Sequence, residues 1–252
     1  MGRRVLLPLP DTDYDTTEVA VPWKLLTEAG HEVVFATERA GTVAACDPRL
    51  LSGVLFGQLG AEPEPIAFYQ ELLRAPAYRQ SLAWDELEAR DFDALLLPGG
   101  HAPGMRQYLE SPVLQAKVVD FVKTGRTFAA ICHGPLVLAR AVDPATGQSV
   151  LHGRRTACLP KYLERTAYLL TAWKLGRYYR TSPAYVEDEV RAAGAGVQRG
   201  PLVLSRRGTR TDDGPTFVVE DGNYLSARWP GDAYAFARAL LSRLDGPGPR
   251  PG

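Results

Sequence analysis

Short continuous apolar segments alternate along the chain with longer segments in which apolar residues recur every three or four positions. The first pattern is typical of strands buried on both faces, and the second of helices with one buried face. We expect strands at residues 5–9, 33–36, 93–97, 128–131, 156–159, 202–204, 217–219 and 224–226. We expect helices at residues 17–29, 66–73, 112–124, 136–141, from 160 to about 175, 184–193 and 232–244, the first capped by Thr16 or Thr17. Because strands alternate with crossover helices, the pattern predicts a doubly wound α/β fold with a mainly parallel sheet and helices on both faces.

Residues 39–90 interrupt this alternation with a weaker pattern. They include a glycine-containing stretch at 53–60 and a turn-rich stretch at 61–65. The segment is too long for an ordinary connection, so we interpret it as a cap-like insertion within a single domain that spans residues 1–245. The proline- and glycine-rich residues 246–252 predict a disordered tail.

One stretch, 128–137, changes from an apolar strand to an apolar helix within about two residues. Cys132 lies at the corner, with Ala130 and Gly134 as the small flanking residues that so sharp a turn requires. This pattern predicts a nucleophile elbow with a cysteine, followed directly by the imidazole of His133. Nearby helix amides are expected to lower the pKa of the thiol. A buried, unreactive thiol is the alternative, but a core strand does not require the His-Gly-Pro sequence that follows.

The composition makes some classes of binding partner unfavourable. The 29 basic and 29 acidic residues cancel without any basic run, which makes nucleic acids and membrane surfaces poor candidates. Three widely spaced cysteines argue against a disulfide framework and fit a reducing cytoplasm. The apolar run at 5–9 is broken by prolines and is too short for a signal peptide or a membrane span. We therefore expect a soluble cytoplasmic protein that acts on a small molecule.

Other candidate groups follow the expected strands. Glu18 comes after the first strand, and Glu164 after the strand that follows the elbow. Gly99 and Gly100 come directly after the third strand. Because the carboxyl ends of parallel strands meet at one sheet edge, these groups should converge on Cys132. Each also has a plainer interpretation: Glu18 as an acid at a helix N-terminus, the glycines as a tight turn, and Glu164 as a solvated acid.

Taken together, these motifs resemble the ThiJ/PfpI superfamily, which has the flavodoxin-like, class I glutamine amidotransferase-like fold. The resemblance covers nearly the whole chain. The segments that carry it are Thr17-Glu18, Leu97-Pro98-Gly99-Gly100-His101, Ala130-Ile131-Cys132-His133-Gly134-Pro135 and Glu220-Asp221-Gly222-Asn223-Tyr224. The 39–90 insertion and Pro160–Glu164 are similar to the heat-shock chaperone and glyoxalase III branch. Two places depart from that branch, Ala102 after His101 and the segment 226–230.

The resemblance implies a set of site residues. The catalytic group would comprise Cys132 as nucleophile, His133 as general acid/base, Glu164 orienting that ring, and a protonated Glu18 donating to the sulfur. The residues expected to bind an oxyanion or substrate are Gly99, Gly100, His101 and Gly134, with the backbone amides of Gly100 and His133 as oxyanion donors. No cofactor and no metal site is expected, because His31, His101 and His152 are scattered. Relatives are commonly dimers, so a homodimer is expected.

Three functions remain open. The first, which we favour, is a cofactor-independent glyoxalase III-like enzyme that converts a 2-oxoaldehyde such as methylglyoxal and water to a 2-hydroxy acid. The second is a cysteine hydrolase of small amides or peptides. The third is a holding chaperone or oxidation sensor in which Cys132 is oxidised. Glu18 decides our preference, because a carboxyl group beside the thiol is surplus to simple hydrolysis but useful for moving a proton between neighbouring carbons.

Overall fold

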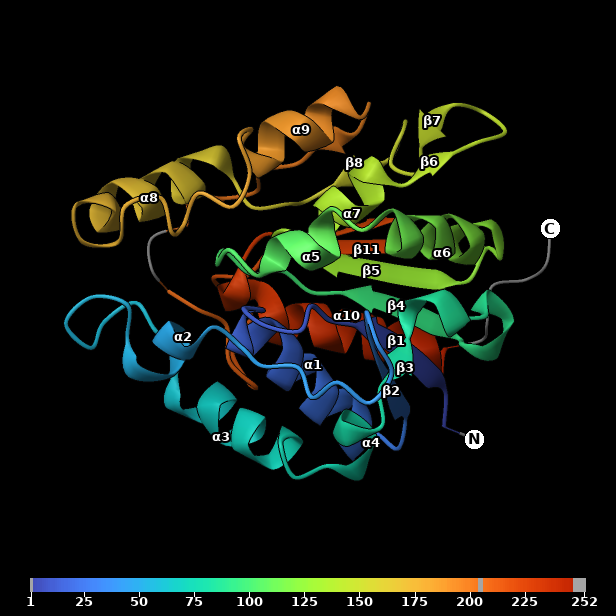
Figure 1. The fold of residues 1–252 in the computed structure, drawn as a ribbon, viewed down its shortest axis with the longest axis horizontal. Helices are drawn as coiled ribbons and strands as arrows, with labels where there is room; N and C mark the ends of the chain where they lie inside the picture. The colour runs from blue at the N-terminus through green and yellow to red at the C-terminus, as the bar shows by residue number, and fades with distance from the viewer. Residues whose placement is uncertain (1, 204–205, 247–252) are drawn as a thin grey trace.

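The computed structural model describes residues 2–203 and 206–246, and a twisted sheet forms the centre of this part of the chain (Figure 1). Seven strands pair in the order β10-β11-β5-β4-β1-β2-β3. All neighbouring pairs are parallel except β10 with β11. The strands are β1 (Arg4–Pro8), β2 (Glu32–Thr37), β3 (Leu82–Ala83), β4 (Ala94–Leu97), β5 (Thr127–Ile131), β10 (Val218–Asp221) and β11 (Tyr224–Ala227).

Helices cover both faces of the sheet, as the sequence predicts. On one face lie α1 (Thr16–Glu28), α3 (Pro63–Leu72) and α10 (Ala233–Asp245) (Figure 1). On the other lie α5 (Met105–Leu109), α6 (Pro112–Lys123), α7 (Gly134–Arg140), α8 (Lys161–Leu175) and α9 (Val186–Ala192). The flavodoxin-like, doubly wound architecture is therefore confirmed.

The central strands explain this arrangement. Every residue of β4 and β5 is buried, which matches their uninterrupted apolar sequences and the cover on both faces. Their register pairs Leu97 with Ala130, so β4 and β5 end beside each other. The loops that follow these two strands are thereby brought together at one edge of the sheet.

The segment 39–90 contains α2 (Pro48–Ser52), α3, α4 (Pro76–Arg79), the edge strand β3 and a 3₁₀ turn at Trp84–Glu86, and a second 3₁₀ turn, Ala89–Asp91, begins at its end. Beyond the main sheet, β6 (Val142–Asp143) pairs with β7 (Gln148–Ser149), and β8 (Arg155–Thr156) with β9 (Gly196–Val197). No helix within residues 2–203 and 206–246 is long and apolar enough to cross a membrane.

Two predicted strands are wrong in the described residues. The strand expected at 156–159 is only the two-residue β8, because the next backbone N–H groups bond irregular partners: that of Ala157 donates to Ser226 Oγ at 2.8 Å and that of Leu159 to Cys132 O at 3.0 Å. Residues 202 and 203 form no strand, and residue 204 of that prediction lies outside the described residues. The tail predicted at 246–252 also lies outside them after Gly246.

Candidate active site

The backbone forms the predicted elbow between β5 and α7. Cys132, directly after β5, has φ +60°, a left-handed conformation that a non-glycine residue adopts at an energetic cost. His133 caps the N-terminus of α7, and Gly134 begins that helix. A Cβ at Gly134 would lie 2.2 Å from Leu97 O, so the elbow needs glycine there for close approach to the end of β4.

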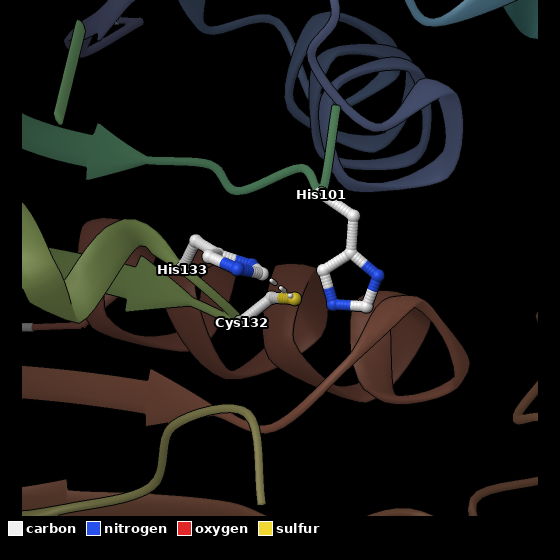
Figure 2. A group of neighbouring side chains, drawn as sticks. All are labelled: His101, Cys132 and His133. Carbon is white, nitrogen blue, oxygen red and sulfur yellow. Dashed lines mark hydrogen bonds between the residues drawn. The ribbon is translucent and has the colours of Figure 1, made fainter. Parts of the chain in front are cut away.

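Two imidazoles flank the thiol. Cys132 Sγ lies 3.5 Å from His133 Nδ1, and the ring of His101 meets that of His133 edge-on, with centroids 4.6 Å apart (Figure 2). Burial lowers the pKa of His101 to about 4 and, with His101 and Arg140 nearby, holds the pKa of His133 well below its usual range. Both rings are therefore neutral near pH 7, and His133 is able to accept the thiol proton.

The same three residues bring donor atoms within 4.8 Å of one another, a geometry that could hold a thiophilic metal ion. The sequence analysis expected no metal site, because His101 and His133 belong to loops 32 positions apart. They meet only because β4 and β5 are neighbours in the sheet.

Glu18 is fully buried beside the thiol. Its Oε2 accepts a hydrogen bond from Gly99 N at 2.8 Å, while no described residue donates to Oε1. Burial, reinforced by the nearby Asp15 carboxylate, raises the pKa of Glu18 well above its usual value. The raised pKa favours the protonated side chain, which can hold an O–H donor beside Cys132.

Asp15 positions Glu18 through the start of α1. Its carboxylate accepts from Thr17 N at 2.8 Å and Glu18 N at 3.1 Å, so Asp15 is the N-cap, and the predicted cap at Thr16 or Thr17 is wrong. Aspartate is a preferred N-cap residue, so this position could have been found from the sequence. Burial raises the pKa of Asp15 to about 6.

The predicted glycines have different roles. A Cβ at Gly99 would lie 2.5 Å from His133 N and 2.9 Å from both Cys132 Cβ and Glu18 Oε2, so glycine is required by close packing. Its N–H is already bonded to Glu18, so it is not available to bind an oxyanion or substrate. Gly100 and His101 line the cavity in front of the thiol.

The predicted depression of the thiol pKa is wrong for this structure. Cys132 is only 3% exposed, and burial raises its pKa well above the usual value. The carboxylate of Asp15 acts in the same direction, and the backbone N–H of His133 opposes both effects. The nucleophile must therefore form by proton transfer during the reaction rather than rest as a thiolate.

Glu164 does not orient His133. Its Oε1 accepts from Arg180 Nη1 at 3.2 Å and its Oε2 from Val186 N at 2.9 Å. The Nε2 atom of His133 has no hydrogen-bond partner among the described residues. Glu164 therefore ties the first turn of α8 to the start of α9, and the predicted His133–Glu164 pair is not formed. Burial raises the pKa of Glu164 to about 7, against the lowering effect of Val186 N–H and Arg180.

A cavity of about 250 Å³ opens in front of Cys132. Most of its lining comes from the sheet edge, residues 47–61 and α8, and residues 179, 207, 229 and 230 complete it. The lining residues are Asp15, Thr17, Asp47, Leu50, Val54, Leu59, Gly60, Ala61, Gly100, His101, Cys132, Leu159, Leu163, Thr166, Ala167, Leu170, Thr171, Tyr179, Arg207, Trp229 and Pro230. The insertion thus contributes directly to the site.

The late segment that departs from the family pattern also reaches the cavity. Arg228 and Asp232 form a buried ion pair at 2.9 Å, which holds the intervening turn against the end of β11. Trp229 and Pro230 in that turn line the cavity. The sequence offered no signal for this contact, because the pair stabilises only a short 3₁₀ turn, Pro230–Asp232.

Comparisons with known proteins agree with this geometry. The sequence profile described as ThiJ/PfpI family-like matches residues 9–195. An uncharacterised protein of Schizosaccharomyces pombe is 30% identical over 67% of this chain and 63% of its own length. Deglycase PYRAB04690 of Pyrococcus abyssi is 28% identical over 96% of this chain and 99% of its own.

Among solved structures, glyoxalase III of Candida albicans is similar with a TM-score of 0.66 and 21% identity, over 95% of this chain and 96% of that one. At that identity the likeness shows a shared fold. The family profile spans most of the chain, from the end of β1 through the elbow to α9, and so the chain belongs to the ThiJ/PfpI family.

Proposed function

We propose that this protein is a cofactor-independent glyoxalase, which converts a 2-oxoaldehyde and water to a 2-hydroxy acid. The observation that carries the proposal is Glu18, a fully buried carboxyl group beside the thiol whose raised pKa favours the protonated form. Acyl transfer alone needs a nucleophile, a base and oxyanion donors. A carboxylic acid with one oxygen unpaired suits a reaction in which a proton leaves one carbon and returns to its neighbour.

The first step forms a hemithioacetal. Cys132 Sγ adds to the aldehyde carbon, C1, while His133 Nδ1 takes the thiol proton across the 3.5 Å contact. Glu18 donates its proton to the aldehyde oxygen. The neutral thiol and neutral imidazole of the resting site thus become a C–S bond and an imidazolium, with Glu18 left ionised. The N–H groups of Gly100 and His133 are the candidates to steady the oxygen.

The second step moves hydrogen from C1 to C2. Glu18 removes the C1 hydrogen as a proton, His133 protonates the C2 oxygen, and the C–H electron pair becomes the double bond of an enediol. Glu18 then returns the proton to C2 while His133 takes the proton of the C1 hydroxyl. A thioester remains. C1 has been oxidised and C2 reduced, so no outside electron donor or acceptor is needed.

Water completes the cycle by attacking the thioester carbon. Glu18 takes one water proton, and His133 protonates the departing sulfur of Cys132. The 2-hydroxy acid leaves and loses its own proton to solvent. All three side chains return to their starting states, which is why a carboxyl group with a raised pKa serves in every step.

Two other functions, deglycation and holding-chaperone activity, also have supporting observations. Relatives named deglycases match nearly the whole chain, and such an activity would act on an adduct carried by another molecule. Cys132, only 3% exposed at the base of a cavity of about 250 Å³, fits a small free aldehyde better than a protein side chain. A holding chaperone is favoured by Phe56 and Leu59, which are 79% and 53% exposed in the insertion.

The test is incubation of the purified protein with methylglyoxal, without glutathione or added metal, while lactate is measured. Wild type, Cys132→Ala, Glu18→Gln and the matched control Cys158→Ala are run side by side. We expect loss of lactate formation with Cys132→Ala and a fall of roughly a hundredfold or more with Glu18→Gln, the scale of general acid–base catalysis. Cys158→Ala should stay active because its thiol does not line the cavity.

The alternatives give different results. Lactate formed equally by wild type and Glu18→Gln would overturn the role of Glu18. No lactate even at millimolar methylglyoxal, with suppression of the aggregation of a heated client protein, would favour the chaperone. Hydrolysis of small amides in the absence of aldehyde turnover would favour the hydrolase.

A further inference from the structure

We infer that the preferred 2-oxoaldehyde carries a bulky uncharged apolar group, such as an aromatic ring or a branched alkyl chain, on its ketone carbon. This inference rests on the proposed function. The cavity volume is about 250 Å³, which is room for far more than one water molecule. Methylglyoxal has a single methyl group beyond its two carbonyls and would leave most of that space unfilled.

The walls beyond the reacting groups are mainly aliphatic. The insertion supplies Leu50, Val54 and Leu59, and α8 supplies Leu163 and Leu170. These side chains belong to two segments more than a hundred residues apart, and they meet only around the cavity. A group placed between them is removed from water by contacts that recognise area and shape rather than charge.

Polar groups on the wall are already bonded to the protein. Asp47 accepts from Tyr179 Oη at 2.9 Å and from Arg49 N at 3.0 Å. Arg207 donates to Gly60 O at 3.2 Å and stacks over the ring of Trp229. Arg207 is the single arginine or lysine among the described lining residues, and its charge is already paired with the carboxylate of Glu62 at 3.6 Å.

The acidic side chains in the lining also select against negative charge. Asp15 and Asp47 both line the cavity and are buried. An anionic substituent would approach two carboxyl groups with Arg207 as the nearest lining cation, itself committed to Gly60. A neutral apolar substituent avoids this repulsion.

The apolar surface continues outward from the cavity. Leu59 and Leu170 line it and are 53% and 51% exposed, which places them at its rim. Farther out, Phe56 stacks on Trp173, with ring centroids 6.3 Å apart, and joins the insertion to α8. Apolar side chains left this exposed around a cavity are typical of a surface that is covered when a ligand binds.

The experiment compares kcat/KM for methylglyoxal, phenylglyoxal and 4-carboxyphenylglyoxal, from initial rates of 2-hydroxy acid formation. We expect wild type to favour phenylglyoxal over methylglyoxal by at least about tenfold, the scale of one or more apolar groups entering a matching pocket. The carboxylated ring should lose most of that gain. Phenylglyoxal and 4-carboxyphenylglyoxal carry the same 2-oxoaldehyde group on an aromatic ring. The difference between their kcat/KM values therefore reports the effect of the negative charge.

A pair of variants separates the pocket from intrinsic reactivity. Ala167→Phe fills the cavity from α8 and should lower kcat/KM for phenylglyoxal about tenfold or more while methylglyoxal changes little. Leu169→Phe, on the same helix but exposed and outside the lining, is the control and should change neither. Circular dichroism of both variants checks that α8 is intact.

The two proposals fail in different ways. If wild type converts none of the three aldehydes, the proposed function is wrong. If methylglyoxal is the best substrate, or Ala167→Phe affects it as strongly as phenylglyoxal, the function stands and the inferred substrate class is overturned. Equal rates for the neutral and carboxylated rings would overturn the selection against charge.

Discussion

The floor and the wall of the cavity are built in opposite ways. The floor, defined here as Glu18, Gly99, Cys132 and His133, is buried almost completely and packed at the carboxyl ends of central strands. The wall, defined as residues 47–61 with α8, has large apolar side chains open to solvent. On the floor a Cβ added at Gly99 would lie 2.5 Å from His133 N, whereas Leu59 and Leu170 at the rim of the wall are half exposed.

This difference separates the residues expected to carry out the reaction from those expected to choose the substrate. Proton transfer depends on distances held to within fractions of an ångström, which close packing on a rigid sheet provides. Substrate choice depends on a surface that can differ without disturbing that geometry. Changes to the floor should therefore act on kcat for any substrate, and changes to the wall on KM for particular ones.

Among substitutions in the floor, Gly99→Ala is expected to lower kcat the most. The new Cβ would lie 2.5 Å from His133 N, so the loop or the elbow must shift. Misplacement of catalytic groups on the ångström scale costs on the order of a hundredfold in rate. We expect at least that loss in kcat for methylglyoxal, with a lower midpoint of thermal unfolding.

The matched control is Gly196→Ala in β9, where a Cβ would lie 3.7 Å from the nearest atom, Arg154 O. It should leave both kcat and the unfolding midpoint nearly unchanged. A fully active Gly99→Ala variant would mean that the floor is not held as tightly as the packing indicates.

Glu164→Gln tests an acid outside the floor against Glu18→Gln within it. One oxygen of Glu164 accepts from Arg180 and the other from the start of α9, and neither contacts His133. We therefore expect the variant to have a kcat within about threefold of wild type, a much smaller loss than the removal of a general acid or base causes. A loss of tenfold or more would restore Glu164 to the mechanism and contradict the contacts described above.

The same variant changes the pH dependence of stability. Burial raises the pKa of Glu164 from 4.5 to about 7, so the native state binds one more proton than the unfolded chain between these values. This group's stabilisation is full below pH 4.5 and is lost as pH rises to about 7. Urea unfolding at pH 5 and pH 7.5 should show a smaller fall in stability for Glu164→Gln than for wild type.

The smallest expected effect comes from the rim. Phe56→Ala removes the stack on Trp173 between two exposed rings, so the free energy of unfolding should change by only about 0.5 kcal/mol or less. Hydrogen exchange of α8 should nevertheless become faster, because the stack ties this helix to the insertion. Unchanged exchange in α8 would show that the contact does not restrain the wall.

Most residues of the floor could be predicted from the sequence. Few contacts of the wall could be predicted in this way. The change from an apolar strand to a helix at Cys132 identified the elbow, and the positions of Glu18 and Gly99 after other strands predicted their convergence. Asp15 was missed, although an aspartate before a helix is a common cap. The predicted role of Glu164 failed because the position of α8 depends on Arg180 and Val186, which no local pattern connects with it. Likewise, the meeting of Phe56 with Trp173 arises from tertiary packing over more than a hundred residues.

The left-handed backbone of Cys132 has a consequence for how this chain can change. At φ +60° glycine is the residue that the main chain accommodates without strain, and a residue with a Cβ costs on the order of 1 kcal/mol there. The folded state is thus less stable with cysteine at position 132, the residue that carries the proposed reactive sulfur, than an unstrained backbone would allow. Glycine at this corner would relieve the backbone strain but would remove the sulfur, so stability and the proposed reactivity make opposite demands on this residue.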